Sequence, residues 1–314
     1  MIVFKEREKE SRENTLSAEE TVRNILTDVR ARGDEAVQDY TERFDGFRPS
    51  RLRVKDEELK KARSGLDKET EKALVFAAER IENFARAQRS CLKDLRYEIS
   101  PGVVLGHRLI PIASCGCYVP AGRYPLPSSA LMSVIPARVA GVTRIAACSP
   151  GQKDGRGIHP AVLAALDIAG VDEVYCMGGA QAIGAFAWGT ETISPVDMIV
   201  GPGNRYVAEA KRQVSGSVGI DMLAGPSEAV ILADESADPE WVAADLLAQS
   251  EHDADAWAVL ITTSPSLAEA TAREVERQGE LLSTGEAALE SWRNNGRILV
   301  AESVEEGIAA ANEI

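Results

Sequence analysis

Two residues near position 250 carry side chains of a kind that binds metals. Gln249 and His252 stand three residues apart at the end of a helix predicted for 239–252, so both are expected to project from one helical face. Such a pair can supply two ligands to one metal ion, although glutamine is an uncommon zinc ligand beside histidine, cysteine and carboxylates. A histidine at a helix C-terminus also caps the helix, because the dipole there favours a cation. The spacing therefore leaves a metal site and a capping histidine both open.

Glycine-rich stretches follow three predicted strands, and each opens a helix. They lie at 118–129, 178–181 and 201–204. Glycines let the backbone approach a ligand closely, and free amides at a helix N-terminus favour an anion such as a pyrophosphate. Because neither the G-x-G-x-x-G nor the Walker A pattern occurs, the residues alone indicate a nucleotide or phosphate ligand, with tight turns as the alternative. A fourth stretch, 224–228, either presents Ser227 to a polar substrate or forms a turn.

The elements that must hold these stretches alternate from about residue 110 onward. Short apolar runs, expected as strands, lie at 114–119, 144–149, 173–177, 197–200, 229–233, 257–262 and 297–301. Segments of helical length separate most of them, at 128–141, 160–169, 180–188, 203–214, 239–252 and 264–282. This alternation predicts an α/β fold with parallel sheets covered by helices on both faces. Ahead of it, Ser17, Asp34 and Asp67 are expected to cap helices of a helical N-terminal segment.

The composition argues against several classes of protein. The 314 residues carry a net charge of −14, which repels phosphate backbones, so we expect no nucleic-acid partner. No apolar run approaches about 18 residues and no signal-peptide core is visible, so we expect no membrane partner and a cytoplasmic location. The five cysteines are an odd number without an export signal, which argues against a disulfide framework. Cys148 and Cys176 lie in apolar runs and are expected to be buried thiols.

Several long stretches, taken together, resemble the histidinol dehydrogenase family. They are 118–122, 127–141, 148–150, 178–183, 200–204, 209–214, 220–228 and 245–252. The resemblance implies two incomplete Rossmann-like domains and a homodimer. It divides the chain into an N-terminal tail, 1–14, a first domain made of 15–117 with 228–314, and a second, NAD-binding domain, 118–227.

The resemblance also implies an activity and its site. The family oxidises L-histidinol to L-histidine in two NAD-dependent steps through a bound aldehyde, with zinc positioning the substrate. The NAD contacts match Tyr118, Gln181 and Asn204. The substrate contacts match Ser227, Gln249 and His252, and the last two also match zinc ligands. A zinc bound to substrate nitrogens would hold the carbinol carbon in the fixed pose that hydride transfer needs.

One family segment has no match in the sequence. The Pro-Glu-His-Leu segment that carries the family's proton-transfer glutamate and histidine is expected a few residues beyond Ile314, as are two further zinc ligands and the C-terminal tail. Two ligands are too few for a tight zinc site. We therefore expect the 314-residue chain alone to have little or no activity, and to be a fragment of a longer reading frame.

Three alternatives remain open at this point. One is a related NAD-dependent dehydrogenase of another small polyol such as a dihydroxypropane sulfonate, whose anionic group Arg123 would meet. Another is a truncated, inactive paralogue that binds NAD or a partner. The last is a phosphate-binding α/β domain unrelated to dehydrogenation.

Overall fold

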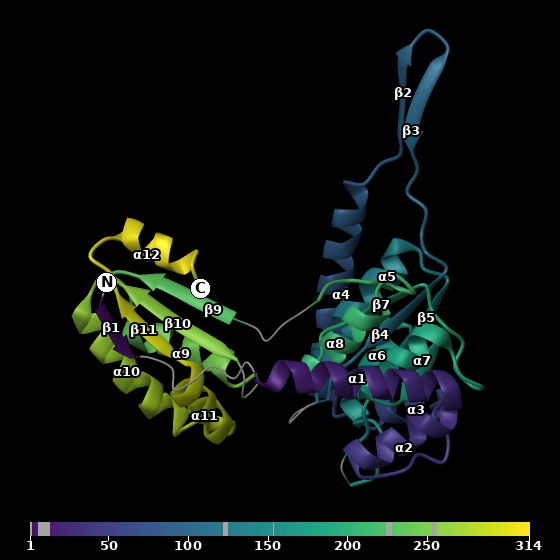
Figure 1. Ribbon diagram of the computed structural model, residues 1–314, viewed down its shortest axis with the longest axis horizontal. Coiled ribbons are helices and arrows are strands. Elements are labelled where there is room, and N and C mark those ends of the chain that lie inside the picture. Colours follow the sequence, from purple (N-terminus) through teal and green to yellow (C-terminus); the bar gives the residue numbers. More distant parts are fainter. Residues whose placement is uncertain (1, 6–12, 122–124, 153, 224–227, 253–255) are drawn as a thin grey trace. The chain divides into compact units, whose positions relative to one another are not determined.

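The computed structural model describes residues 2–5, 13–121, 125–152, 154–223, 228–252 and 256–314. These residues form two compact units, each described here by itself. The large unit is Thr15–Ala224, and the small unit is Gly225–Ile314 together with Met1–Asn14. Figure 1 labels the elements of both.

A five-stranded parallel sheet forms the centre of the large unit. Its strands are β6 (Glu173–Cys176), β5 (Arg144–Ser149), β4 (Ser114–Tyr118), β7 (Met198–Val200) and β8 (Gly219–Ile220), in that order. Adjacent strands pair in parallel throughout. The strands β4 to β6 bury nearly every side chain, which is why they read as unbroken apolar runs.

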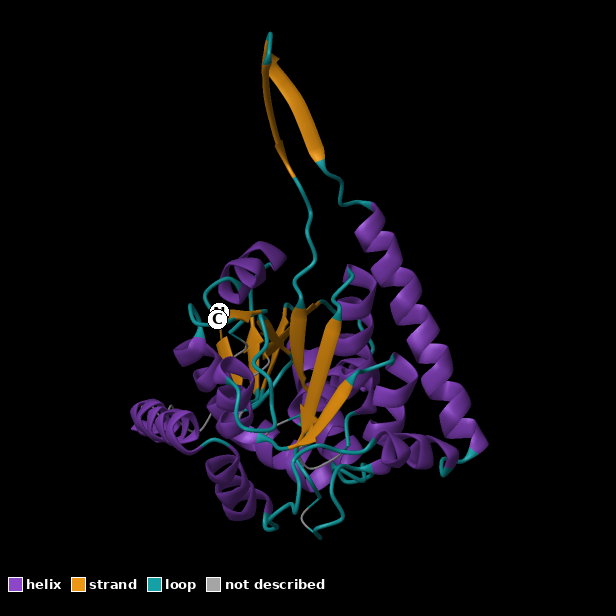
Figure 2. Ribbon diagram, turned by 90° about the vertical axis from the view of Figure 1, so that its right-hand side faces the viewer, coloured by secondary structure: helices purple, strands orange, loops and turns teal. Residues whose placement is uncertain are grey.

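Eight helices cover the two faces of this sheet. One face packs against α1 (Glu13–Arg32), α2 (Asp34–Asp45), α7 (Gly179–Trp188) and α8 (Arg205–Val214). The other packs against α3 (Asp56–Ser64), α4 (Lys68–Ser90), α5 (Pro127–Ala140) and α6 (Pro160–Ala169). An antiparallel hairpin of β2 (Leu95–Ser100) and β3 (Val103–His107) joins α4 to β4, and all its residues are exposed (Figure 2).

The small unit is built on a four-stranded sheet. Its strands are β1 (Ile2–Lys5), β11 (Arg297–Val300), β10 (Trp257–Thr262) and β9 (Glu228–Ala233), in that order. The last three are parallel, whereas β1 pairs antiparallel with β11. The helices α9 (Pro239–Ser250), α10 (Pro265–Gly279) and α11 (Gly285–Asn295) share one apolar core with the sheet. The helix α12 (Val304–Ala311) contributes to a second, smaller core.

The structure confirms the α/β class with parallel sheets and differs from the sequence-based division of the chain. Residues 15–117 group with 118–224 rather than with 228–314, because β4 occupies the middle of the large sheet and α1 to α4 pack on its two faces. Residues 2–5 are not a tail, since they form β1 at the edge of the small sheet.

Several element boundaries also differ. The predicted cap Ser17 is wrong, because α1 begins at Glu13 and contains it. Asp67 does cap α4, accepting hydrogen bonds from two backbone amides. The helix over 285–295 was not predicted. None of the described helices is both long enough and apolar enough to cross a membrane.

Candidate functional site

The carboxyl ends of the large unit's strands form the candidate site. From the central strand β4, the chain builds β5 and β6 to one side and then β7 and β8 to the other. In open parallel sheets, ligands bind at the carboxyl edge where the strand order reverses in this way. Here that point lies between Tyr118, which ends β4, and Gly201, which follows β7. A Cβ on Gly201 would lie 2.1 Å from the Tyr118 carbonyl oxygen, and its φ is +114°, so only glycine fits.

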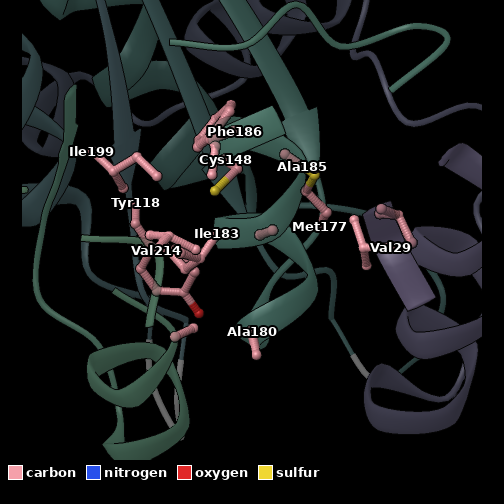
Figure 3. Close-up of a cluster of buried hydrophobic side chains, with 14 of the residues drawn as sticks. Val29, Tyr118, Cys148, Met177, Ala180, Ile183, Ala185, Phe186, Ile199 and Val214 are labelled. Atoms are coloured by element: carbon pink, nitrogen blue, oxygen red, sulfur yellow. The ribbon is translucent and has the colours of Figure 1, made fainter. Parts of the chain in front are cut away.

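Tyr118 anchors the first turn of α7 to this edge. Its side chain is 4% exposed and lies among the apolar residues of α7 and α8 (Figure 3). The phenol oxygen accepts a hydrogen bond of 3.1 Å from the Gly179 amide. Burial raises the pKa of Tyr118 well above its ordinary value, so the phenol stays protonated and keeps an O–H to donate. A Cβ on Gly178 would lie 2.6 Å from Pro150, so this turn packs tightly on the end of β5.

Gln181 lies in the first turn of α7 and is 1% exposed. Its Oε1 and Nε2 are both buried without a hydrogen-bond partner among the described residues. A Cβ on Gly179 would lie 2.6 Å from Oε1, so the glycine makes the position of this amide possible. Burying an unpartnered amide costs about 1–3 kcal/mol in proteins. The amide is therefore suited to pair with a polar group that the described residues do not supply.

Asn204 caps α8 at the same edge. Its Oδ1 accepts hydrogen bonds from the amides of Tyr206 and Val207, at 3.0 and 3.1 Å. The residue is exposed. Because the helix engages the amide oxygen, a ligand at this turn would meet chiefly the side-chain NH₂. Asn204 is thus a structural cap and, at the same time, a candidate ligand contact.

A half-buried ion pair that the sequence did not reveal fixes the turn before Asn204. Lys211 is 2% exposed, forms an ion pair with Asp221 and donates a 3.0 Å hydrogen bond to the Gly201 carbonyl. Asp221 in turn accepts a 2.8 Å hydrogen bond from the Gly201 amide. Both backbone groups of Gly201 are therefore held. The available signal was the position of Lys211 on the same face of α8 as the apolar Val207 and Val214.

The unpartnered buried polar atoms of the large unit gather at this edge. Among its described residues, such atoms belong to Asp45, Ser149 and Gln181. Ser149 ends β5, and Asp45 ends α2 and accepts a hydrogen bond from the amide of Gly151, just beyond β5. Because unpartnered buried polar groups are rare in native proteins, their concentration here makes this edge the candidate ligand site.

Gln249 and His252 belong to the small unit. The helix α9 ends at Ser250, so His252 lies beyond the helix instead of within it as predicted. Its Nδ1 hydrogen-bonds to the Ala248 carbonyl oxygen at 2.9 Å, which makes it a cap of the helix end. Nδ1 donates to a carbonyl in this arrangement, which leaves Nε2 as the ring's acceptor or metal-binding atom. Within the described ranges, no group of three or more His, Cys, Asp or Glu side chains could hold a metal.

The remaining sequence-based candidates, Ser227 and Arg123, lie outside the described residues. Cys148 and Cys176 are buried as expected, and burial raises the pKa of both thiols. The structure thus brings Tyr118, Gln181 and Asn204 to one sheet edge, while Gln249 and His252 stand together at the end of α9.

Comparisons with known proteins agree on one family. The model of the histidinol dehydrogenase family matches residues 7–314. A histidinol dehydrogenase of Agrobacterium fabrum is 51% identical over 94% of this chain and 68% of its own length. A histidinol dehydrogenase homolog of Shouchella clausii is 43% identical over 98% of this chain and 72% of its own length.

A solved structure supports the same conclusion. The crystal structure of histidinol dehydrogenase from Elizabethkingia anophelis superimposes with a TM-score of 0.85 at 36% identity, covering 98% of this chain and 69% of that one. The chain therefore spans roughly two thirds of the relatives that it matches. Family model, sequence identity and structural match together show that this chain belongs to the histidinol dehydrogenase family of oxidoreductases.

Proposed function

We propose that this protein oxidises L-histidinol to L-histidine with NAD, through an aldehyde that stays bound. The conversion of an alcohol to a carboxylate removes two hydrides, so it consumes two NAD and one water and releases two NADH and three protons. NAD would supply the hydride acceptor. The observation that carries the proposal is the unpartnered amide of Gln181 at the switch point of the large sheet, beside the Tyr118 phenol and the Asn204 turn.

The chain's own residues fit a dinucleotide at this edge. The glycines at 178–179 and 201 bring backbone close to the site, and a Cβ at any of them would collide with neighbouring atoms. The N-termini of α7 and α8 lie at the same edge and favour a pyrophosphate. Tyr118 and Asn204 would donate hydrogen bonds, and Gln181 would both donate and accept.

We further propose that Gln249 and His252 hold zinc together with ligands outside the described residues. The support is the Nδ1 contact of His252 with Ala248, since metal-binding histidines usually donate the other ring N–H to a carbonyl or carboxylate. In the protein extended to the length of its relatives, a His252→Ala variant should retain much less zinc after dialysis than the wild type. Metal content equal to wild type would contradict this assignment, and His159→Ala, at the cap of α6, is the control.

Substrate and dinucleotide are tested by two measurements. NADH formation with L-histidinol, compared with a dihydroxypropane sulfonate, separates the histidinol activity from that of a related polyol dehydrogenase; the assay uses the protein extended to the length of its relatives. Calorimetry with NAD and with inorganic phosphate separates a dinucleotide site from a simple phosphate site. A protein that binds phosphate but not NAD would refute the proposal.

The Asn204 contact requires a variant that keeps the helix cap. Asn204→Ala removes both the cap and the amide, whereas Asn204→Ser keeps a capping oxygen. We expect both variants to weaken NAD binding, and only Asn204→Ala to lose about 1 kcal/mol of stability. NAD affinity unchanged in Asn204→Ser would show that Asn204 acts only as a cap.

We also propose that the protein forms a homodimer. The hairpin of β2 and β3 exposes Leu95, Tyr97, Ile99, Val103 and Leu105, all more than 45% accessible. Apolar side chains gathered on an exposed element mark a protein interface more often than free surface. Light scattering coupled to gel filtration gives the mass directly, and a monomer at micromolar concentration would contradict this proposal.

A further inference from the structure

The end of β5 lacks an acidic residue of its own. In dinucleotide-binding folds, a carboxylate at the end of the second strand accepts hydrogen bonds from the adenosine ribose. In the five-stranded sheet β4 is the first strand and β5 the second, and β5 ends at Ser149 and is followed by Pro150-Gly151-Gln152. The first carboxylate along this loop is Asp154, which is exposed and forms an ion pair with Arg156.

Asp45 brings a carboxylate to this place from another element. It is the last residue of α2, which ends in a left-handed Gly46. The Gly151 amide donates a hydrogen bond to the Asp45 carboxylate. A Cβ on Gly151 would lie 2.2 Å from the ring of Phe47, so the chain after α2 packs directly on the end of β5.

One oxygen of this carboxylate lacks a hydrogen-bond partner in the part of the chain that the structure describes. Asp45 Oδ2 is buried and has no hydrogen-bond partner among the described residues. Arg48, the next cation along the chain, is engaged by Asp39 and Glu42. Among the described residues, Cys176 and Tyr118 interact electrostatically with Asp45, and burial raises the pKa of both, so they are neutral near neutral pH. They therefore bring no positive charge to the carboxylate.

We propose that Asp45 accepts hydrogen bonds from the adenosine ribose hydroxyls of NAD and selects NAD over NADP. The inference rests on the proposed dinucleotide function. A ribose diol offers O–H donors to an acceptor that lacks a partner, and hydrogen bonds to a charged acceptor are among the strong ones. The 2′-phosphate of NADP would instead bring negative charge against a half-buried carboxylate in a region of reduced dielectric, which is repulsive.

Burial of the Asp45 carboxylate changes its pKa. It raises the pKa of Asp45 to about 6, because burial disfavours the charged form more than the Gly151 hydrogen bond favours it. A residue kept only to anchor Gly151 would not need this charge, since an asparagine oxygen accepts the same hydrogen bond. The charge is thus the property that a ligand would use.

The test compares Asp45→Asn with Asp154→Asn, which removes the same charge from the neighbouring loop. Calorimetry of the 314-residue chain with NAD, NADP and 2′-deoxy-NAD gives the affinities, and thermal unfolding gives the stability. We expect Asp45→Asn to weaken NAD binding about tenfold or more, to narrow the preference for NAD over NADP, and to reduce the effect of removing the 2′-hydroxyl. Its melting temperature should equal or exceed that of the wild type.

Asp154→Asn should match the wild type in every binding measurement. If Asp45→Asn binds all three ligands as the wild type does, the Asp45 assignment fails while the dinucleotide site stands. If the wild type and Asp154→Asn do not bind NAD at all, the proposed function fails and this inference falls with it.

Discussion

Gln181 and Asp45 are the two residues of the candidate site whose buried polar atoms carry our proposals. Each buries a polar atom that no described residue engages. Such atoms lower the stability of the folded chain, because they lose water without gaining a partner. A ligand that supplies the missing hydrogen bonds recovers this free energy on binding. Replacing either residue by one without the unpartnered atom should therefore raise the stability of the chain and lower its affinity for the ligand.

Replacement of Gln181 by methionine should expose this link. The apolar side chain has a similar size and removes the unpartnered amide, so we expect Gln181→Met to gain about 1–2 kcal/mol in stability and to lose about tenfold in NAD affinity. Urea unfolding and calorimetry measure the two quantities. Gln213→Met is the matched control, because Gln213 already hydrogen-bonds to Glu19 and Glu209. A destabilised Gln181→Met with normal NAD affinity would contradict the prediction.

The carboxyl of Asp45 predicts a pH dependence of stability. Its pKa is about 6 in the folded chain, above the ordinary 3.8. The folded chain therefore holds the proton more tightly than the unfolded chain, and the contribution of Asp45 to stability falls as pH rises from about 4 to about 6. Since other carboxylates titrate too, the readout is the difference from Asp45→Asn, measured by urea unfolding at several pH values. The free energy of unfolding of the variant, relative to that of the wild type, should rise as pH increases across this range. A difference that does not change with pH would refute the assignment.

At the scale of elements, short turns held by buried contacts position the site. The helix α8 begins after a turn that contains Gly201. The Gly201 amide donates a hydrogen bond to Asp221, and its carbonyl accepts one from Lys211. The helix α7 begins at a turn tied to β4 by the phenol of Tyr118. Both turns therefore owe their geometry to side chains from other parts of the chain.

The Lys211–Asp221 pair gives a prediction for α8. Lys211→Met would leave the Asp221 carboxylate without its cation, so we expect a loss of about 2 kcal/mol, less than for a fully buried pair because Asp221 reaches solvent. NAD affinity should fall as well, since the Gly201 turn loosens. Arg212→Met, which breaks a surface pair with Glu209, should cost less than about 1 kcal/mol and leave NAD binding intact. Equal effects of the two variants would show that the buried pair has no special role.

The sequence predicted elements well wherever the pattern was local. Runs such as 144–149 and 257–262 are buried on both faces, so their unbroken apolar character identified strands. Tyr118, Gln181 and Asn204 lie at one sheet edge because each stands at or shortly after the end of a parallel strand. Their contact with NAD stays a prediction. Asp45 could not be found in this way, because its position depends on α2 packing against a strand far along the chain.

Nonlocal packing explains the remaining differences. The sequence does not reveal that 15–117 joins the large unit, since that grouping follows from which sheet receives β4. The helix end at Ser250 was missed because the pattern continues to His252, whose ring bonds back to Ala248 and imitates another turn.

At the scale of the whole molecule, the two units have separate cores and should unfold separately. The large-unit cores and the small-unit cores share no residues. We expect calorimetry of the 314-residue chain to show two transitions, with NAD raising chiefly the one that belongs to the large unit. Limited proteolysis at intermediate temperature identifies which unit has opened. A single transition that NAD shifts as a whole would contradict this view.

The pairing of β1 with β11 has a consequence for synthesis. Ile2 lies opposite Val300, and Lys5 donates hydrogen bonds to the carbonyls of Trp292 and Gly296. A ribosome makes Ile2 almost three hundred codons before its partner Val300, whereas Thr15–Ala224 emerges as one continuous segment. The nascent chain can therefore complete the large unit before β1 pairs with β11, and the sheet of the small unit closes only after that.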